Sequence, residues 1–125
     1  MKFFIFGHPN ISSSHKTTLE FAKDKELTKR GTCIVGVKAD FSLQEIQKLL
    51  KSRKIKIIIE KEEIIADTNP EFNDKKEIVI RKTDFKSERT LGINANKAAV
   101  NLSRKLIEKL KNPKEKVTVE IKPMR

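Results

Sequence analysis

The sequence predicts an α+β fold: one domain built from two β-β-α-β half-repeats, with mostly antiparallel strands and two helices. The first observation behind this prediction is that short Ile- and Val-rich segments alternate with only two segments of helical period. The second is that this order of elements occurs twice along the chain, over residues 1–61 and 62–125. A length of 125 residues suits one compact domain with one core.

The predicted strands are segments in which apolar residues alternate or run on without interruption. Residues 33–37, CIVGV, are apolar on both faces, which is typical of a central strand. Residues 54–60 place Ile55, Ile57 and Ile59 on one face, and residues 63–67 are positioned to pair back with them. The full set of predicted strands is 2–6, 17–21, 33–37, 54–60, 63–67, 77–82, 90–94 and 116–122.

Two segments have helical spacing. Residues 42–52 begin with Ser42 and Glu45, which have the spacing of a capping box. Residues 97–111 carry their apolar side chains on one stripe, and Asn112-Pro113 is expected to end that helix.

The two halves have the same order of predicted elements. Residues 33–60 and 90–121 share a strand, a small polar hinge, a helix and a strand, and an X-Pro turn precedes each, at His8-Pro9 and Asn69-Pro70. This similarity predicts an internal duplication of a unit of about 60 residues. The alternative is chance similarity between two ordinary strand–helix–strand units.

The charge balance indicates a class of partner. The 28 Lys and Arg residues against 17 Asp and Glu give a net charge of +11, which attracts polyanions. The alternative is that the charge only maintains solubility. No apolar run approaches the roughly 20 residues that cross a membrane, so no membrane partner is expected. The single Cys33 excludes an internal disulfide and favours the cytoplasm, and the abundance of Lys and Glu hints at a thermophile.

The segment GHPNISSSHKTT, residues 7–18, contains both histidines of the chain. His8, His15 and Asp40 are therefore the candidate catalytic residues, with Cys33 as a possible nucleophile. The alternative is that this segment is a capped turn and that the Cys33 thiol is buried and inert. The spacing of these residues does not assemble the three ligands of a catalytic metal site, so neither a metal nor a cofactor is predicted.

Two strand–helix junctions carry a lysine where a helix is predicted to begin. Lys38 and Lys97 could add charge to an anion site formed by the free N–H groups of a helix N-terminus. The alternative is that Ser42 and Asn96 are plain N-caps and that Asp40 stabilises the turn or the helix dipole.

Two basic connections complete the candidate surface. The first, KDKELTKRG, carries Lys29 and Arg30, and the second, RKTDFKSER, surrounds Phe85 with basic residues. Phe85 could stack on a base, or it could fold inward in a solvated hairpin. The residues predicted to bind nucleic acid or phosphate are Lys29, Arg30, Lys38, Arg81, Lys82, Phe85, Arg89 and Lys97.

Three functions remain open from these residues. The first is binding of nucleic acid, with RNA favoured, through phosphate contacts. The second is a small enzyme or ligand-binding protein for a phosphorylated or nucleotide-like molecule at the His8 and His15 turn. The third is a subunit or adaptor that meets an acidic protein.

The motifs GHPNI, SHKTTLEF, LTKRGTCIVGVKAD and RTLGINANKAAVNLSRKL together resemble domain-of-unknown-function family 371, a group of small archaeal proteins. The resemblance covers nearly the whole chain and implies a cytoplasmic archaeal protein, but it implies no activity. The family pattern has Gly-His-Pro where this chain has Thr68-Asn69-Pro70, and it favours Asp where this chain has Thr32 and Asn96. These departures weaken any mechanism that needs a second histidine turn or a carboxylate at Asn96.

Overall fold

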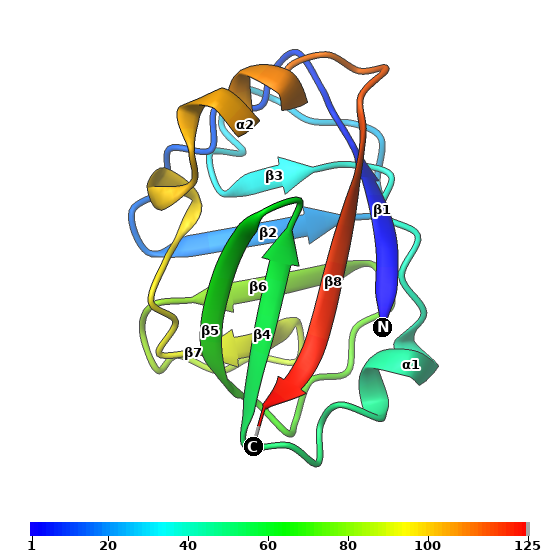
Figure 1. Cartoon of the computed structure of the whole chain (residues 1–125), viewed down its shortest axis with the longest axis vertical. Coiled ribbons are helices and arrows are strands. Elements are labelled where there is room, and N and C mark those ends of the chain that lie inside the picture. Colours follow the sequence, from blue (N-terminus) through cyan, green and yellow to red (C-terminus); the bar gives the residue numbers. More distant parts are fainter. Residues whose placement is uncertain (125) are drawn as a thin grey trace.

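In the computed structural model, which describes residues 1–124, eight strands form one sheet in the order β1-β8-β4-β5-β7-β6-β2-β3 (Figure 1). Most neighbouring strands are antiparallel, and two short helices lie outside the sheet, which confirms the predicted α+β class. The strands are β1 (Lys2–Phe6), β2 (Thr18–Ala22), β3 (Ile34–Gly36), β4 (Lys54–Ile59), β5 (Glu62–Thr68), β6 (Glu77–Arg81), β7 (Thr90–Ile93) and β8 (Lys116–Met124).

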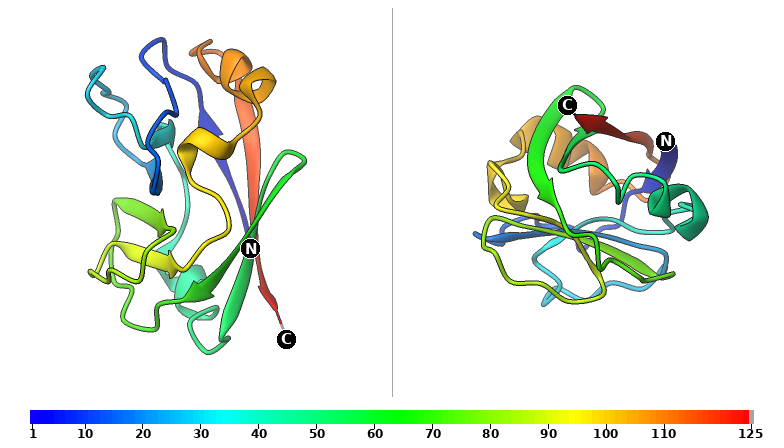
Figure 2. Two further views of the ribbon diagram at one scale, coloured as in Figure 1. Left: turned by 90° about the vertical axis from the view of Figure 1, so that its left-hand side faces the viewer. Right: turned by 90° about the horizontal axis from the view of Figure 1, so that it is seen from below.

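A single residue pair joins the two ends of this strand order. Phe6 and Val37 exchange both backbone hydrogen bonds, at 2.8 and 2.9 Å, so β1 is linked to the residue that follows β3. The sheet therefore closes on itself. In Figure 1, β1, β4, β5 and β8 run steeply while β2, β3, β6 and β7 cross behind them, and Figure 2 shows these two layers edge-on.

The core fills the space between the two layers. Alternate isoleucines point inward from the predicted strands, and Ile5, Ile57 and Ile121 are fully buried. Phe3 packs edge-on against Phe21 and Phe41, with ring centroids 5.5 and 5.7 Å apart. Burial of these apolar side chains is the dominant stabilising force, because the helices are too short to contribute much on their own.

The first helix, α1 (Leu43–Gln47), is shorter than the predicted 42–52. Beyond it the backbone turns through bonds to the third preceding residue, as from Leu49 N–H to the Ile46 carbonyl at 2.8 Å. The predicted capping box is wrong, because the Ser42 side chain makes no cap hydrogen bond.

The second predicted helix, 97–111, is divided. A short 3-10 turn, η1 (Ala99–Asn101), precedes α2 (Arg104–Leu110), and the backbone between them is extended at Leu102. The Arg104 guanidinium donates to the carbonyls of Ala99, Val100 and Leu102, and it also reaches those of Ser12 and Ser13. These bonds satisfy carbonyls that a continuous helix would have used, so the amphipathic stripe does not form one helix.

Gly7 is required where the end of α2 meets β1. A Cβ atom at this position would overlap the backbone carbonyl oxygens of Leu110 and Asn112. The next residue, His8, donates its backbone N–H to the Leu110 carbonyl at 2.8 Å. The absence of a side chain at Gly7 therefore lets the C-terminal turn of α2 dock directly on the chain.

Each half contains three strands before its helix, so the order is β-β-β-α-β rather than the predicted β-β-α-β. Within each half, the second and third strands are parallel neighbours with one register irregularity, as in β2–β3 and β6–β7. A residue shortly after the third strand has positive φ in both halves, 52° at Lys38 and 51° at Asn94.

No helix in the described part of the chain is long and apolar enough to cross a membrane.

Candidate functional site

His8 stabilises a turn. Its Nδ1 atom accepts the backbone N–H of Asn10 at 3.0 Å, and the His8 carbonyl accepts that of Ile11 at 3.0 Å. In the second half, Asn69 accepts the backbone N–H of Glu71 through its side-chain oxygen at 3.1 Å. The imidazole of His8 thus accepts the N–H of the second following residue, as the Asn69 side chain does in the corresponding turn of the second half.

His15 has the same kind of role. Its Nδ1 atom accepts the N–H groups of Thr17 and Thr18 at 3.2 and 3.1 Å, just where β2 begins. Asp74 accepts two successive N–H groups in the same way before β6. The geometry favours the capped-turn alternative for residues 7–18. Among residues 1–124, no three His, Cys, Asp or Glu side chains are grouped so that they could hold a metal ion.

Asp40 is engaged with the backbone of β1. Its carboxylate accepts the N–H of Phe4 at 2.7 Å, and the Asn96 amide accepts the N–H of Ile65 at 3.0 Å in the same arrangement on β5. The expectation that Asn96 is a helix N-cap is wrong, because Ser103 precedes α2 and accepts the Leu106 N–H. Asp40, in the segment after β3, and Asn96, in the segment after β7, therefore each fasten that segment to a neighbouring strand, β1 and β5 respectively.

The two lysines predicted to add charge at helix N-termini have other partners in the structure. Lys97 lies in an ion pair with Glu62 at 3.2 Å, and α2 begins seven residues later, at Arg104. Lys38 lies over the Phe6 ring, with its Nζ atom 5.7 Å from the centroid. By contrast, Lys29 and Arg30 are exposed in the turn before β3, and no ion pair involves either of them within residues 1–124.

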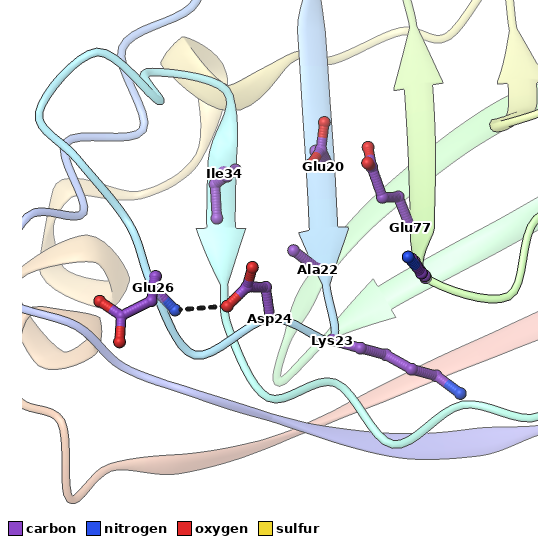
Figure 3. Close-up of a pocket in the computed structure, with 8 residues that line it drawn as sticks. Glu20, Ala22, Lys23, Asp24, Glu26, Ile34 and Glu77 are labelled. Atoms are coloured by element: carbon purple, nitrogen blue, oxygen red, sulfur yellow. Dashed lines mark hydrogen bonds between the residues drawn. The ribbon is translucent and has the colours of Figure 1, made fainter.

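A pair of carboxyl groups that sequence reasoning missed lies on the outer face of the β2–β6 pair. Glu20 is buried, with 7% of its surface exposed, and Glu77 projects from the neighbouring strand (Figure 3). Burial, and next the Glu77 carboxyl, raise the pKa of Glu20 to about 7. The sequence carried one signal of this pair: Glu20 is an acidic residue inside a strand whose other residues are apolar or threonine.

Arg89 links the two carboxyl groups. Its Nη1 atom lies 2.7 Å from Glu77 Oε2 and 3.7 Å from Glu20 Oε1. This predicted phosphate ligand is therefore already paired with carboxylates of the same chain.

Cys33 is only partly buried, contrary to the prediction of a buried thiol. Its Sγ lies 3.9 Å from Glu20 Oε1. Burial of the thiol, and next the negative charge of Glu20, raise the pKa of Cys33 to about 11. A thiol with this pKa is a poor nucleophile near neutral pH, so the geometry favours the inert alternative for a different reason than deep burial.

A cavity of about 490 Å³ adjoins the carboxyl pair. Figure 3 shows that β2, β3, β6 and the segment after β2 contribute to it. Its lining combines acidic, basic and apolar side chains, and consists of Glu20, Ala22, Lys23, Asp24, Glu26, Ile34, Lys76 and Glu77.

Phe85 lies at the surface rather than in the core, with 58% of its area exposed. The Arg81 guanidinium carbon lies 4.8 Å from the centroid of the Phe85 ring, in a cation–π contact. The Arg81 Nε atom also donates to Thr90 Oγ1 at 2.9 Å, which fixes the guanidinium. Of the two alternatives for Phe85, the structure shows the exposed one.

The fold and these surfaces define a small, basic α+β protein whose sheet is closed and whose polar clusters lie on the outer face. The chain belongs to the family described as Domain of unknown function (DUF371), whose model matches residues 3–124. It is also 41% identical over 120 residues to an uncharacterized protein of the archaeon Methanocaldococcus jannaschii. That match covers 87% of this chain and 89% of the relative.

Proposed function

We propose that this protein binds single-stranded nucleic acid, with RNA favoured, mainly through phosphate contacts. The observation that carries the proposal is the exposed Phe85 ring with the Arg81 guanidinium stacked on it. An aromatic ring beside a fixed guanidinium offers a base a stacking surface and offers the adjoining phosphate a charged partner. The net charge of +11 supports the same class of ligand.

The charge of Arg81 is not compensated. Within residues 1–124, no carboxylate forms an ion pair with it. Burial, and next the neighbouring Arg89, lower the pKa of Arg81 from its ordinary value. A bound phosphate would stabilise the charged form of Arg81, because it would place the missing opposite charge beside this half-buried cation.

Exposed lysines surround this stack. Lys82 donates its backbone N–H to the Thr17 carbonyl at 2.8 Å, which brings Lys16 and Lys82 onto the same edge of the β2–β6 pair. Lys86 follows Phe85 by one residue and is also exposed. We call Lys16, Arg81, Lys82, Phe85 and Lys86 together the Phe85 patch.

The proposed readout is of backbone and shape rather than of an extended base sequence. Phe4 is the only other aromatic side chain exposed to a comparable degree within residues 1–124, at 37%, and Lys116 covers it with its Nζ atom 3.9 Å from the ring centroid. One free aromatic ring cannot form a broad stacking platform. Phosphate contacts, which carry no sequence information, are therefore expected to dominate.

The test is a charge reversal with a matched control. Arg81→Glu combined with Lys82→Glu should weaken binding to single-stranded RNA at low salt by at least tenfold for every sequence tried. Lys48→Glu combined with Lys51→Glu changes the net charge equally at exposed positions around the end of α1, away from the patch, and should weaken binding much less. Equal losses in the two double variants would show that only net charge matters and would overturn the proposed patch.

The adaptor alternative receives less support. The large apolar side chains exposed within residues 1–124 are Phe4, Phe85 and Val100, which come from separate segments of the chain. A docking surface for a protein partner normally presents a larger continuous apolar area.

We further infer an internal duplication in a cytoplasmic protein. The duplication is supported by the recurring turn caps, by the matching hydrogen bonds of Asp40 and Asn96 with β1 and β5, and by the two parallel strand pairs. The presence of a single cysteine supports the cytoplasmic location, and a surface rich in Lys and Glu supports a thermophilic host.

A further inference from the structure

The cavity beside Glu20 is separate from the Phe85 patch but lies on the same outer face. Its volume of about 490 Å³ falls in the range that holds a small organic ligand. Arg89 links the two regions, because it bonds Glu77 at the cavity and lies close enough to Arg81 to depress the pKa of that residue. A ligand in the cavity could therefore be one nucleotide of an RNA bound on the Phe85 patch, or it could be a free small molecule.

Glu20 offers this cavity an acceptor with spare capacity. The side chain is more than nine-tenths buried, and a carboxylate has about four lone-pair positions for hydrogen bonds. Among residues 1–124, no N–H group donates to it within 3.5 Å; its partners are Cys33 Sγ at 3.9 Å, Arg89 Nη1 at 3.7 Å and the Glu77 carboxyl, which helps to raise the pKa of Glu20. A buried carboxylate without N–H donors is costly, which favours a ligand that supplies them.

The other walls of the cavity combine apolar surface, lysine side chains and two further carboxyl groups, those of Asp24 and Glu26. Ala22 and Ile34 provide apolar surface, and Glu77 stands beside Glu20 on the neighbouring strand (Figure 3). Lys76 lines the cavity and is exposed, whereas the Lys23 ammonium lies over the Phe41 ring, with its Nζ atom 4.6 Å from the centroid. Lys76 forms no ion pair within residues 1–124, so it is available to a phosphate.

We propose that this cavity binds a guanine base, with the Glu20 carboxylate accepting its N1–H and N2 amino hydrogens and Lys76 facing its phosphate. Guanine is the common base whose Watson–Crick edge presents two adjacent N–H donors, and a carboxylate presents only acceptors. Adenine and cytosine place an acceptor nitrogen beside their amino group, and uracil places its single N–H between two carbonyls. The source of the base is a free nucleotide or a guanine of bound RNA, and only the second source rests on the proposed function.

Protonation should control this site. Glu20 faces Glu77 and Arg81 on β6, Cys33 before β3 and Arg89 before β7, and of these Glu77 opposes its ionisation while Arg89 favours it. Guanine needs the ionised carboxylate, so its affinity should rise between about pH 6 and about pH 8. The protonated carboxyl offers one donor and one acceptor, so the preference for guanine over adenine should shrink at the acid end.

The experiment follows the amide and methyl NMR signals of Ala22 and Ile34 during titration with guanosine, inosine and adenosine monophosphates. At about pH 8 the guanosine nucleotide should bind at least tenfold more tightly than the adenosine nucleotide, and the inosine nucleotide, which lacks the N2 amino group, should fall between them. No shift of these signals, or equal affinity for all three nucleotides, would overturn the proposal.

Glu20→Gln supplies the specificity test. The amide presents one donor and one acceptor, so this variant should lose the guanine preference and gain relative affinity for adenine. Glu77→Gln, at a more exposed position, serves as a second variant if Glu20→Gln fails to fold. It removes a charge that opposes ionisation of Glu20, so the rise of guanine affinity should move to lower pH. Glu45→Gln, on α1, is the matched control and should leave all affinities unchanged. An unchanged guanine preference in Glu20→Gln, or an unshifted pH profile in Glu77→Gln, would contradict the assignment.

A second titration separates the two sources and the two proposals. Single-stranded oligo(U) is compared with the same oligomer carrying one central guanosine, for the wild type and for the Arg81→Glu, Lys82→Glu variant. Guanosine monophosphate binding that survives this double charge reversal supports the cavity, whatever happens to RNA. RNA binding that depends on the patch but not on the central guanosine would assign the cavity to free nucleotides. If the mononucleotide fails while RNA still binds, the cavity proposal is wrong and the proposed function stands.

Discussion

The Nδ1 atom of His15 accepts the backbone N–H of Thr18 at 3.1 Å, at the start of β2. At the start of β6, which pairs with β2, the Asp74 carboxylate accepts the backbone N–H of Glu77 at 2.8 Å. A histidine and an aspartate thus perform the same task at the two ends of the β2–β6 pair. The chemistry that the two side chains share is a single acceptor aimed at free N–H groups.

His15→Asn should therefore be tolerated, whereas His15→Ala should lower the free energy of unfolding by about 1 kcal/mol, the typical value of a lost cap. Urea unfolding of the two variants measures the difference. If Ala and Asn prove equally destabilising, the imidazole has a role other than capping.

Gly7→Ala should be strongly destabilising. The added methyl group would overlap the carbonyl oxygens of Leu110 and Asn112, which belong to backbone and cannot rotate away, so a loss of about 3 kcal/mol is expected. Gly31→Ala is the matched comparison, because its new Cβ would meet the flexible end of Leu27 at 2.5 Å. Thermal unfolding should rank Gly7→Ala well below Gly31→Ala, and the reverse order would refute the docking role of Gly7.

Glu20 should make stability depend on pH in an unusual direction. The pKa of Glu20 in the folded protein, about 7, lies above the ordinary value of 4.5, so the folded protein binds the proton more tightly than the unfolded chain does. This contribution is complete below about pH 4.5 and is lost as the pH rises through about 7. Its size is on the order of 2 kcal/mol.

Glu20→Gln removes the titration. The free energy of unfolding of this variant relative to the wild type should therefore rise from about pH 4.5 to about pH 7 and remain constant above it. Glu45→Gln, an exposed substitution on α1, should give a nearly flat difference. Denaturant unfolding across the pH range checks both curves, and a flat difference for Glu20→Gln would disprove the raised pKa.

Cys33 should react slowly in the folded protein. With the pKa of the thiol at about 11, its thiolate fraction at pH 8 is about a hundredfold below that of an unfolded thiol. Alkylation by iodoacetamide should slow by a comparable factor without denaturant. Glu20→Gln removes one of the groups that raise this pKa and should speed the reaction, so an unaltered rate would argue that burial alone controls Cys33.

The salt dependence of RNA binding should count the free cations. The Phe85 patch carries four cations, Lys16, Arg81, Lys82 and Lys86, and within residues 1–124 none of them forms an ion pair. Four phosphate contacts on a single strand give a log–log slope of about −2.8, against about −3.5 for five. Fluorescence anisotropy over a range of salt concentrations measures this slope, and a value near zero would defeat the phosphate mechanism.

The strands were predictable because their side chains follow a local period. The alternation of Ile55, Ile57 and Ile59 reflects burial of one face of β4, and each of these residues is fully buried. The helix over residues 97–111 was predicted too long, because the carbonyls of Ala99, Val100 and Leu102 accept hydrogen bonds from Arg104 rather than from a continuous helical ladder. That interaction depends on the third dimension and leaves no mark on the spacing of apolar residues.

The candidate site was less predictable than the fold. Phe85 and Arg81 are close in sequence, so the basic connection could be identified as a surface. Glu20 and Glu77 come together only because β2 and β6 are antiparallel neighbours, and no local pattern specifies that pairing. The histidines attracted attention because they are rare, although their Nδ1 atoms serve only the local backbone.

The hydrogen bonds between Met1 and Ile121, at 2.9 and 3.0 Å, place the start of β1 beside the end of β8 in an antiparallel pair. The β4–β5 hairpin has the same geometry with its turn at Glu60 and Lys61. A circularly permuted chain, opened at that turn and joined by a short loop from the present C-terminus to Met1, would keep every strand pairing.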